Sequence, residues 1–310
     1  MDESNRDIGS AGPRTTDRYD YFTDVQLWPL RTVLDPLRWL SNFSASERPL
    51  ANRLLEGFVY YSEPLVSQMF RATFANISQF VVRNKSNHLA ASTEWARFLN
   101  SVKIVRVTGE QPNDTDSGYI FSRLAKHWLG FNQSQTIPPE KALELLIKNP
   151  RQNIVFVDDF VGSGNQFRDT WTRYYPVGAG HYSFKTVADA SPVTDTVFYA
   201  PVICTEYGKQ NISKVAPNLK IVPAHLIGPQ YSVLSANSIV WREDMAGEGP
   251  QFVEFSSRRA GIPDRHGEEG CWRGFHELGL AIAFSHGWPD ATIPLFYFDQ
   301  NGWKPLIRKG

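Results

Sequence analysis

The middle of the chain alternates short apolar runs with longer segments of helical spacing. The short runs are rich in β-branched residues, and apolar positions in the longer segments recur every three or four residues. Strands that alternate with helices predict βαβ units and a parallel sheet. The predicted strands are 102–107, 154–157, 197–205 and 219–222, and the predicted helices are 119–129, 140–148, 166–175 and 209–216.

The segments on either side of this region have other patterns. Residues 1–20 are polar and broken by glycine and proline, which predicts a disordered arm. Residues 21–100 predict a helical cap, in which Ser46 is the expected N-cap of a helix with Pro49 in its first turn. The expected organisation is the arm, this cap, an α/β core over residues 101–228 and a C-terminal hood over residues 229–310.

The expected hood contains two contrasting stretches. Residues 247–274 are rich in glycine, arginine, glutamate and proline, which predicts a loop. Residues 278–284 and 293–298 are apolar and flank a turn-like segment at 286–290. This pattern predicts a helix or strand that enters a turn and returns as a strand.

The most informative stretch is 154–166, in which an apolar run precedes Asp158, Asp159 and a glycine-rich turn. Four apolar residues in a row fit a strand that is buried on both faces. The two aspartates lie where this strand is expected to end, and Gly162 and Gly164 allow a tight turn into the next helix. The backbone N–H groups of such a turn and the positive end of the helix favour anion binding.

Three well-known loops differ from this one. No lysine follows Gly164, as a Walker A loop requires, and Phe167 occupies the third glycine position of a dinucleotide fingerprint. A nucleophile elbow, GxSxG, is absent. Alternatively, Asp159 and Ser163 cap a helix and Asp158 is a surface acid, but capping explains neither the paired acids nor both glycines.

Composition and charge narrow the class of protein. The 310 residues are 42% hydrophobic and 21% charged, which is typical of a globular chain. The 32 basic and 32 acidic residues cancel, so there is no strong signal for direct nucleic-acid binding. Two cysteines, Cys204 and Cys271, do not form a disulfide framework or a zinc site. With no apolar run of membrane-spanning or signal-peptide type, we expect a cytoplasmic protein without a membrane partner.

The 154–166 stretch resembles the phosphoribosyl diphosphate (PRPP) binding motif of type I phosphoribosyltransferases. Three further stretches, 109–119, 204–209 and 286–295, resemble the PRTase-CE family, a phosphoribosyltransferase-like family of bacterial conflict systems. The similarity runs from about Trp39 to Arg308. It implies a type I phosphoribosyltransferase-like fold, in which helices flank a central parallel sheet.

The resemblance also implies roles for the residues of the motif. Asp158 and Asp159 would hold the ribose hydroxyls close to Mg²⁺, to which they would contribute as ligands, and would stay ionised there. The segment Gly162, Ser163, Gly164, Asn165 and Gln166 would wrap the 5-phosphate. Gln166 stands where the family commonly has threonine, and Gly162 stands where purine-using members have an acid.

Other candidate residues depend on their expected position at the same edge of the sheet. Thr115, Asp116, Ser117 and Gly118 would bind the diphosphate, or Asp116 or Ser117 would cap an acidic turn. Lys209 would neutralise the diphosphate or pair with Glu206 on a helix surface. His286, Trp288 and Asp290 would bind the acceptor in the hood, or would belong to a structural turn anchored by Trp288 and Pro289.

These residues favour an enzyme that transfers ribose 5-phosphate from PRPP, with Mg²⁺, to an unidentified acceptor or to water. The resemblance implies an effector of bacterial anti-phage defence, in which the reverse transcriptase and the RNA/DNA complex of a retron act as inhibitory partner. Two alternatives remain open. One is a sensor that binds a nucleotide or sugar phosphate without catalysis, and the other is an interaction module that controls a partner.

Overall fold

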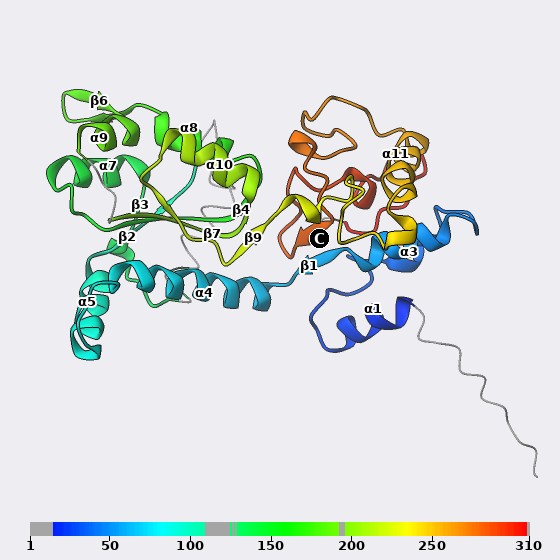
Figure 1. Cartoon of the computed structure of the whole chain (residues 1–310), viewed down its shortest axis with the longest axis horizontal. Coiled ribbons are helices and arrows are strands. Elements are labelled where there is room, and N and C mark those ends of the chain that lie inside the picture. The colour runs from blue at the N-terminus through cyan, green and yellow to red at the C-terminus, as the bar shows by residue number, and fades with distance from the viewer. Residues whose placement is uncertain (1–14, 109–124, 126, 128, 192–195, 309–310) are drawn as a thin grey trace, which may run out of the picture. The chain divides into compact units, whose positions relative to one another are not determined.

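The computed structural model describes residues 15–108, 125, 127, 129–191 and 196–308 (Figure 1). The chain divides into two compact units. The sheet unit contains residues Glu63–Gln230, and the flanking unit combines the chain up to Ser62 with the chain from Tyr231 onward. The expected cap over 21–100 is therefore divided after Ser62, and its second half belongs with the sheet.

A parallel sheet forms the centre of the sheet unit. The strand order is β3-β2-β4-β7-β8, and β9 pairs with the last part of β7. All of these pairings are parallel, which confirms the expected α/β fold with a central parallel sheet. The strands are β2 (Lys103–Arg106), β3 (Thr136–Ile137), β4 (Ile154–Val161), β7 (Val197–Thr205), β8 (Lys220–Ile221) and β9 (His225–Ile227).

Strands β4 and β7 are the most deeply buried part of the sheet. Every residue of β7 is buried, and the register pairs Ile154 with Val197 and Val161 with Cys204. Strand β4 therefore continues four residues beyond its predicted end at Val157. The two aspartates lie inside the strand rather than after it, because β7 offers backbone partners along this whole length.

Helices cover both faces of the sheet (Figure 1). On one face, Phe156 of β4 packs against Phe167 of α8 and Phe184 of α9. On the other face, Phe198 of β7 contacts Phe80 and Phe98 of α4 and α5. The helices are α4 (Glu63–Val81), α5 (His88–Ser101), α7 (Pro139–Lys148), α8 (Asn165–Thr172), α9 (Phe184–Ala190) and α10 (Glu206–Val215), with the hairpin β5 (Tyr175–Val177) and β6 (Gly180–Tyr182) and the 3₁₀ turn η1 (Gln133–Gln135).

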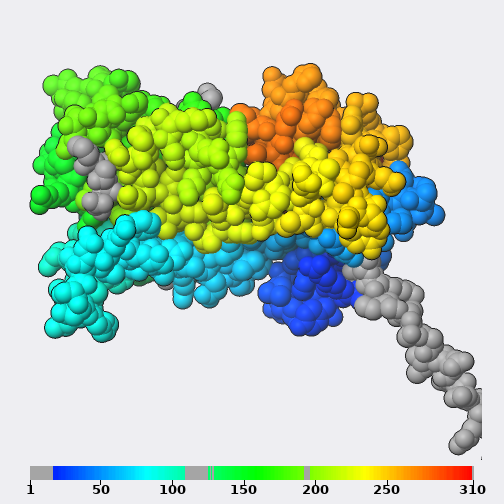
Figure 2. All heavy atoms as spheres, viewed as in Figure 1, coloured from blue at the N-terminus to red at the C-terminus, as the bar shows by residue number. Residues whose placement is uncertain are grey.

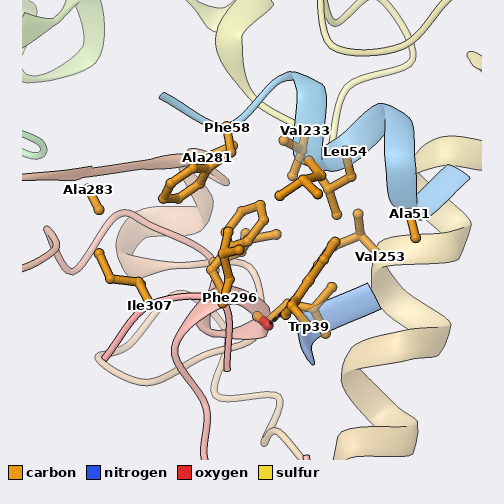
Figure 3. Close-up of a cluster of buried hydrophobic side chains, with 14 of the residues drawn as sticks. Trp39, Ala51, Leu54, Phe58, Val233, Val253, Ala281, Ala283, Phe296 and Ile307 are labelled. Atoms are coloured by element: carbon orange, nitrogen blue, oxygen red, sulfur yellow. Dashed lines mark hydrogen bonds between the residues drawn. The ribbon is translucent and has the colours of Figure 1, made fainter. Parts of the chain in front are cut away.

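The flanking unit is organised around an aromatic core (Figure 3). The ring of Phe296 lies 4.8 Å from that of Phe58 and 5.5 Å from that of Trp39. The indole N–H of Trp39 donates to the Leu295 carbonyl at 2.9 Å, so this buried polar group is satisfied. The elements are α1 (Thr15–Asp24), α2 (Pro36–Leu40), α3 (Arg48–Glu56), β1 (Val59–Tyr61), α11 (Glu248–Ala260), β10 (Ile282–Phe284) and the 3₁₀ turns η3 (Glu243–Met245), η4 (Phe275–Glu277) and η5 (Pro294–Phe296). The 3₁₀ turn η2 (Pro229–Tyr231) spans the boundary between the two units.

Several local expectations for this unit are wrong. Residues 15–20, assigned to the disordered arm, begin α1, because Tyr19 is buried and stacks on Trp28. Helix α3 begins after Glu47 rather than Ser46, and the Glu47 carboxylate accepts from the Ser44 N–H at 2.8 Å. Residues 248–260 of the expected loop form α11, whose Phe252 and Val253 are buried in the core.

The C-terminal apolar block also differs from its expected form. Its first part contributes β10, which pairs in parallel with β1. Its second part forms the 3₁₀ turn η5 and not a returning strand, because buried Leu295 and Phe296 both face the core.

Among the described residues, every helix falls short of the length and apolar character needed to cross a bilayer.

Candidate functional site

The carboxyl edge of the sheet brings the ends of β2, β4 and β7 together. In parallel α/β sheets this edge is where ligands bind. Here it carries Asp158 and Asp159 within β4, the glycine-rich loop after β4, and Thr205 at the start of α10. The loop and Thr205 are in direct contact, since the Thr205 hydroxyl donates to the Gly162 carbonyl.

Asp158 lies inside the protein, with 2% of its surface exposed. The Tyr199 hydroxyl donates to its Oδ2 at 2.9 Å, and the Asp159 N–H donates to its Oδ1 at 3.0 Å. Tyr199 is itself held by stacking on Phe167, with ring centroids 4.3 Å apart. Both carboxyl oxygens of Asp158 are thus engaged by the protein. Sequence reasoning missed Tyr199 because it occupies an apolar strand, where an aromatic residue is expected to fill the core.

Asp159 has a different setting. Its exposed fraction is 9%, and its Oδ1 accepts from the Phe160 N–H at 2.8 Å. Consecutive residues of an extended strand point to alternate faces, yet the Asp158 and Asp159 carboxyl groups stay close enough to interact. They are therefore not equivalent, although the sequence motif assigns them the same type of role.

Burial has an electrostatic consequence for Asp158. Loss of hydration raises its pKa well above the ordinary 3.8, and the nearby Asp159 carboxyl raises it further. Hydrogen bonds from Tyr199 and from the Asp159 N–H act in the opposite direction but are weaker. Without a metal ion, Asp158 therefore favours its protonated form, whereas the sequence predicts an ionised carboxylate beside Mg²⁺.

We expect the stability of the metal-free chain to fall as the pH rises above about 4 because of Asp158. The folded chain binds this proton more tightly than the unfolded chain. The contribution is therefore fully present below the unfolded pKa and is lost as the pH rises through the raised folded pKa. Urea unfolding with a chelator, from pH 4 to pH 8, should show a downward slope that is reduced in Asp158→Asn. Parallel profiles for the two proteins would exclude this effect.

The glycines of the loop allow it to lie close to α10. Gly164 precedes α8 with φ +80°, a left-handed conformation that glycine adopts at little cost. A Cβ atom on Gly164 would lie 2.9 Å from the Gly208 carbonyl oxygen, and one on Gly208 would lie 2.5 Å from the Gly162 carbonyl oxygen. Both glycines are thus required by close backbone approach between the loop and α10.

Helix α10 also fixes the orientation of the loop peptides. The Thr205 hydroxyl donates to the Gly162 carbonyl, and the Asn211 amide donates to the Ser163 carbonyl at 3.1 Å. In a trans peptide the N–H points opposite to the C=O, so the N–H groups of Ser163 and Gly164 point away from α10. Neither N–H group has a hydrogen-bond partner among the described residues. The loop therefore offers two adjacent backbone donors.

The first turn of α8 continues this arrangement. The Asn165 N–H lies 3.3 Å from the Ser163 hydroxyl, and the Gln166 side chain is exposed. The helix is held against β2, because the Thr170 hydroxyl donates to the Thr108 carbonyl at 2.7 Å. Sequence reasoning missed this threonine pair and the contacts from Thr205 and Asn211, because each joins segments that are far apart in the chain.

Thr115, Asp116, Ser117 and Gly118 lie outside the described residues, as does most of the predicted helix 119–129. Thr108 follows β2 by two residues, and its N–H donates to the Thr170 hydroxyl of α8 at 3.0 Å.

Lys209 lines a groove of about 510 Å³ between α10 and β9, together with Glu206 and Leu226. Its neighbour Gly208 is the residue of α10 that faces the glycine loop. The described residues show no ion pair between Lys209 and Glu206, so the surface-pair alternative is not supported. The diphosphate role of Lys209 stays a prediction.

His286, Trp288 and Asp290 belong to the flanking unit. Trp288 stacks on Tyr297 with ring centroids 4.6 Å apart, and His286 lies 5.2 Å from the Phe284 ring. These contacts fit the alternative in which the three residues belong to a structural turn anchored by Trp288 and Pro289. Their role in acceptor binding stays a prediction.

Asp158 and Asp159 fit a Mg²⁺ site that the substrate completes with its own oxygen atoms. The described residues contain no group of three or more histidine, cysteine, aspartate or glutamate side chains that could hold a metal. Mg²⁺ commonly binds one or two carboxylates and completes its shell with water and substrate phosphates. Asp159 and Asp158 provide two carboxyl groups of this type, with Asp158 more enclosed.

Comparison with known families agrees with the fold. The PRTase-CE family model matches residues 36–309, which is most of the chain. No curated protein matches the chain.

Proposed function

Because the chain belongs to the PRTase-CE family and has a phosphoribosyltransferase-like domain, we propose that it uses PRPP at the carboxyl edge of its sheet. The reaction would transfer ribose 5-phosphate to an acceptor or to water and release diphosphate. The observation that carries this proposal is the loop 162–164. Its carbonyl groups are tied to α10 and its Ser163 and Gly164 N–H groups are left for an anion.

The loop and α8 are suited to a terminal phosphate. Two adjacent backbone N–H groups can bind phosphate oxygens, and the positive end of α8 lies directly after them. The chain is neutral overall, so this local donor set has to hold the phosphate without a general electrostatic attraction. We assign the 5-phosphate of PRPP to this loop.

The two aspartates would have separate tasks. Asp159 would accept hydrogen bonds from the ribose hydroxyls, and Asp158, fixed by Tyr199, would support the geometry of β4 beneath the sugar. Mg²⁺ would neutralise the diphosphate as it leaves. Departure of diphosphate gives the sugar positive charge, which a carboxylate held nearby stabilises.

We further propose a role in bacterial anti-phage defence, with the reverse transcriptase and RNA/DNA complex of a retron as inhibitory partner. This role is supported by the family resemblance of stretches 109–119, 204–209 and 286–295. Growth of cells that express the chain alone tests it. Growth arrest that the partner relieves would support an effector, and normal growth at high expression would contradict an unrestrained one.

The enzymatic proposal predicts diphosphate release when the chain is mixed with PRPP and Mg²⁺. Release should stop when a chelator removes the metal and resume when Mg²⁺ is restored. Diphosphate can be followed with a coupled phosphate assay, and PRPP consumption can be followed in parallel. PRPP binding without release would favour the sensor, whereas absence of binding would exclude a PRPP site.

A further inference from the structure

A second pocket opens at the opposite edge of the same sheet, where the strands begin. This amino-edge pocket has a volume of about 910 Å³. Its walls come from the end of α4, from α5, and from the segments that enter β4, β7 and β8. In Figure 2, α4 and α5 form the cyan surface beside the sheet. Strand β4 rises about 3.3 Å per residue, so its eight residues separate this pocket from the glycine loop by roughly 23 Å.

The amino-edge pocket is strongly basic in a chain that is neutral overall. Five basic side chains and one acidic side chain line it. Arg83, Arg151 and Lys220 form no ion pair with any residue in the described part of the chain. The acid, Glu94, lies between Lys85 at 3.0 Å and Arg97 at 2.8 Å. The three uncompensated cations come from three separate segments, so the fold and not a local charge run gathers them.

The same pocket has an exposed aromatic surface. Phe80 lines it with 43% of its surface exposed. Its ring is supported by Phe198 of β7, with centroids 6.2 Å apart. Asn84 also lines the pocket, and its amide can donate and accept hydrogen bonds.

We propose that the amino-edge pocket binds a nucleoside polyphosphate, separately from the PRPP site. Arg83 and Arg151 would bind the phosphates, since guanidinium groups match phosphate geometry, and the Lys220 ammonium would add a third positive charge. Phe80 would stack on the base. The volume lies within the range of small-molecule sites, and the cations surround one pocket instead of following an extended groove. This favours a mononucleotide over a nucleic-acid strand.

Titration calorimetry with ATP as the probe tests this assignment. We expect ATP to bind, and Arg83→Ala/Arg151→Ala to weaken its affinity by at least about 100-fold, since two charge-assisted contacts are lost. The matched control, Lys148→Ala/Lys185→Ala, also removes two positive charges but from surface ion pairs outside the pocket, and should bind ATP as the wild type does. Arg83, Arg151 and Lys148 are exposed and Lys185 is half-buried, and thermal unfolding verifies that each variant is folded.

A second pair of variants identifies the base contact and separates the two sites. Phe80→Ala should weaken ATP by about tenfold but leave inorganic triphosphate unchanged, because only ATP has a ring to stack. Asp158→Asn/Asp159→Asn should leave ATP affinity unchanged whether or not PRPP is a ligand. The proposal is overturned if ATP does not bind, if the arginine variant binds it normally, or if a single-stranded 12-nucleotide DNA competes more strongly than ATP.

Discussion

The double variant Asp158→Asn/Asp159→Asn is expected to bind PRPP in the presence of Mg²⁺ at least about 100-fold more weakly than the wild type. Each hydrogen bond to a charged group contributes about 1.5–3 kcal/mol, and the affinity changes tenfold for each 1.4 kcal/mol. Amides keep the shape of both side chains and remove their negative charge. Titration calorimetry measures the loss directly.

The single variants distinguish the two acids. Asp159→Asn should account for most of the loss, because Asp158 already uses both carboxyl oxygens within the protein. A matched control is Glu140→Gln/Asp189→Asn, which neutralises two exposed acids of the sheet unit. Unchanged PRPP affinity in the double variant, or an equal loss in the control, would contradict the assignment of Asp158 and Asp159 to the sugar.

Replacing Gly208 with alanine is expected to destabilise the chain by about 2 kcal/mol. Gly208 is the third residue of α10, and at a helical position without a steric conflict alanine normally stabilises by up to about 1 kcal/mol relative to glycine. Here the new methyl group would lie 2.5 Å from the Gly162 carbonyl oxygen and 2.8 Å from a Val161 methyl carbon, so backbone has to move. Overpacking of this kind costs about 1–3 kcal/mol or more. Urea unfolding measures whether the free energy of unfolding falls or rises in the Gly208→Ala protein.

The same substitution should also weaken PRPP binding, because it displaces the loop that holds the phosphate. Gly247→Ala is the matched control, since a methyl group at Gly247 meets no atom within 4 Å. That variant should be as stable as the wild type or slightly more stable. A stabilised Gly208→Ala protein would show that α10 does not hold the loop tightly.

The sequence contains enough information to locate the sheet and the loop. Strand β7 was predicted with its observed bounds, because a long apolar run can be buried only at the centre of a parallel sheet. The glycine loop could be found because acids and glycines occur together after such a run. Strand β7 and the glycine loop are each defined by residues that are adjacent in the chain, so a sequence pattern can reveal them.

Contacts between distant segments could not be predicted in the same way. The hydrogen bond from Tyr199 to Asp158 depends on the register of β4 against β7, and burial then changes the pKa of Asp158. The pairing of Gly208 with Gly162 depends on where α10 crosses the loop. Helix α11 was missed because glycine, proline and charged residues at its ends concealed the buried side chains Phe252 and Val253.

The central claim is that loop 162–166 binds the 5-phosphate of PRPP. Hydrogen–deuterium exchange of the wild-type chain, with and without PRPP and Mg²⁺, tests it most directly. Because the Ser163 and Gly164 N–H groups lack partners among the described residues, they should exchange rapidly alone and become protected when PRPP binds. Binding of PRPP without protection of this loop would contradict the account.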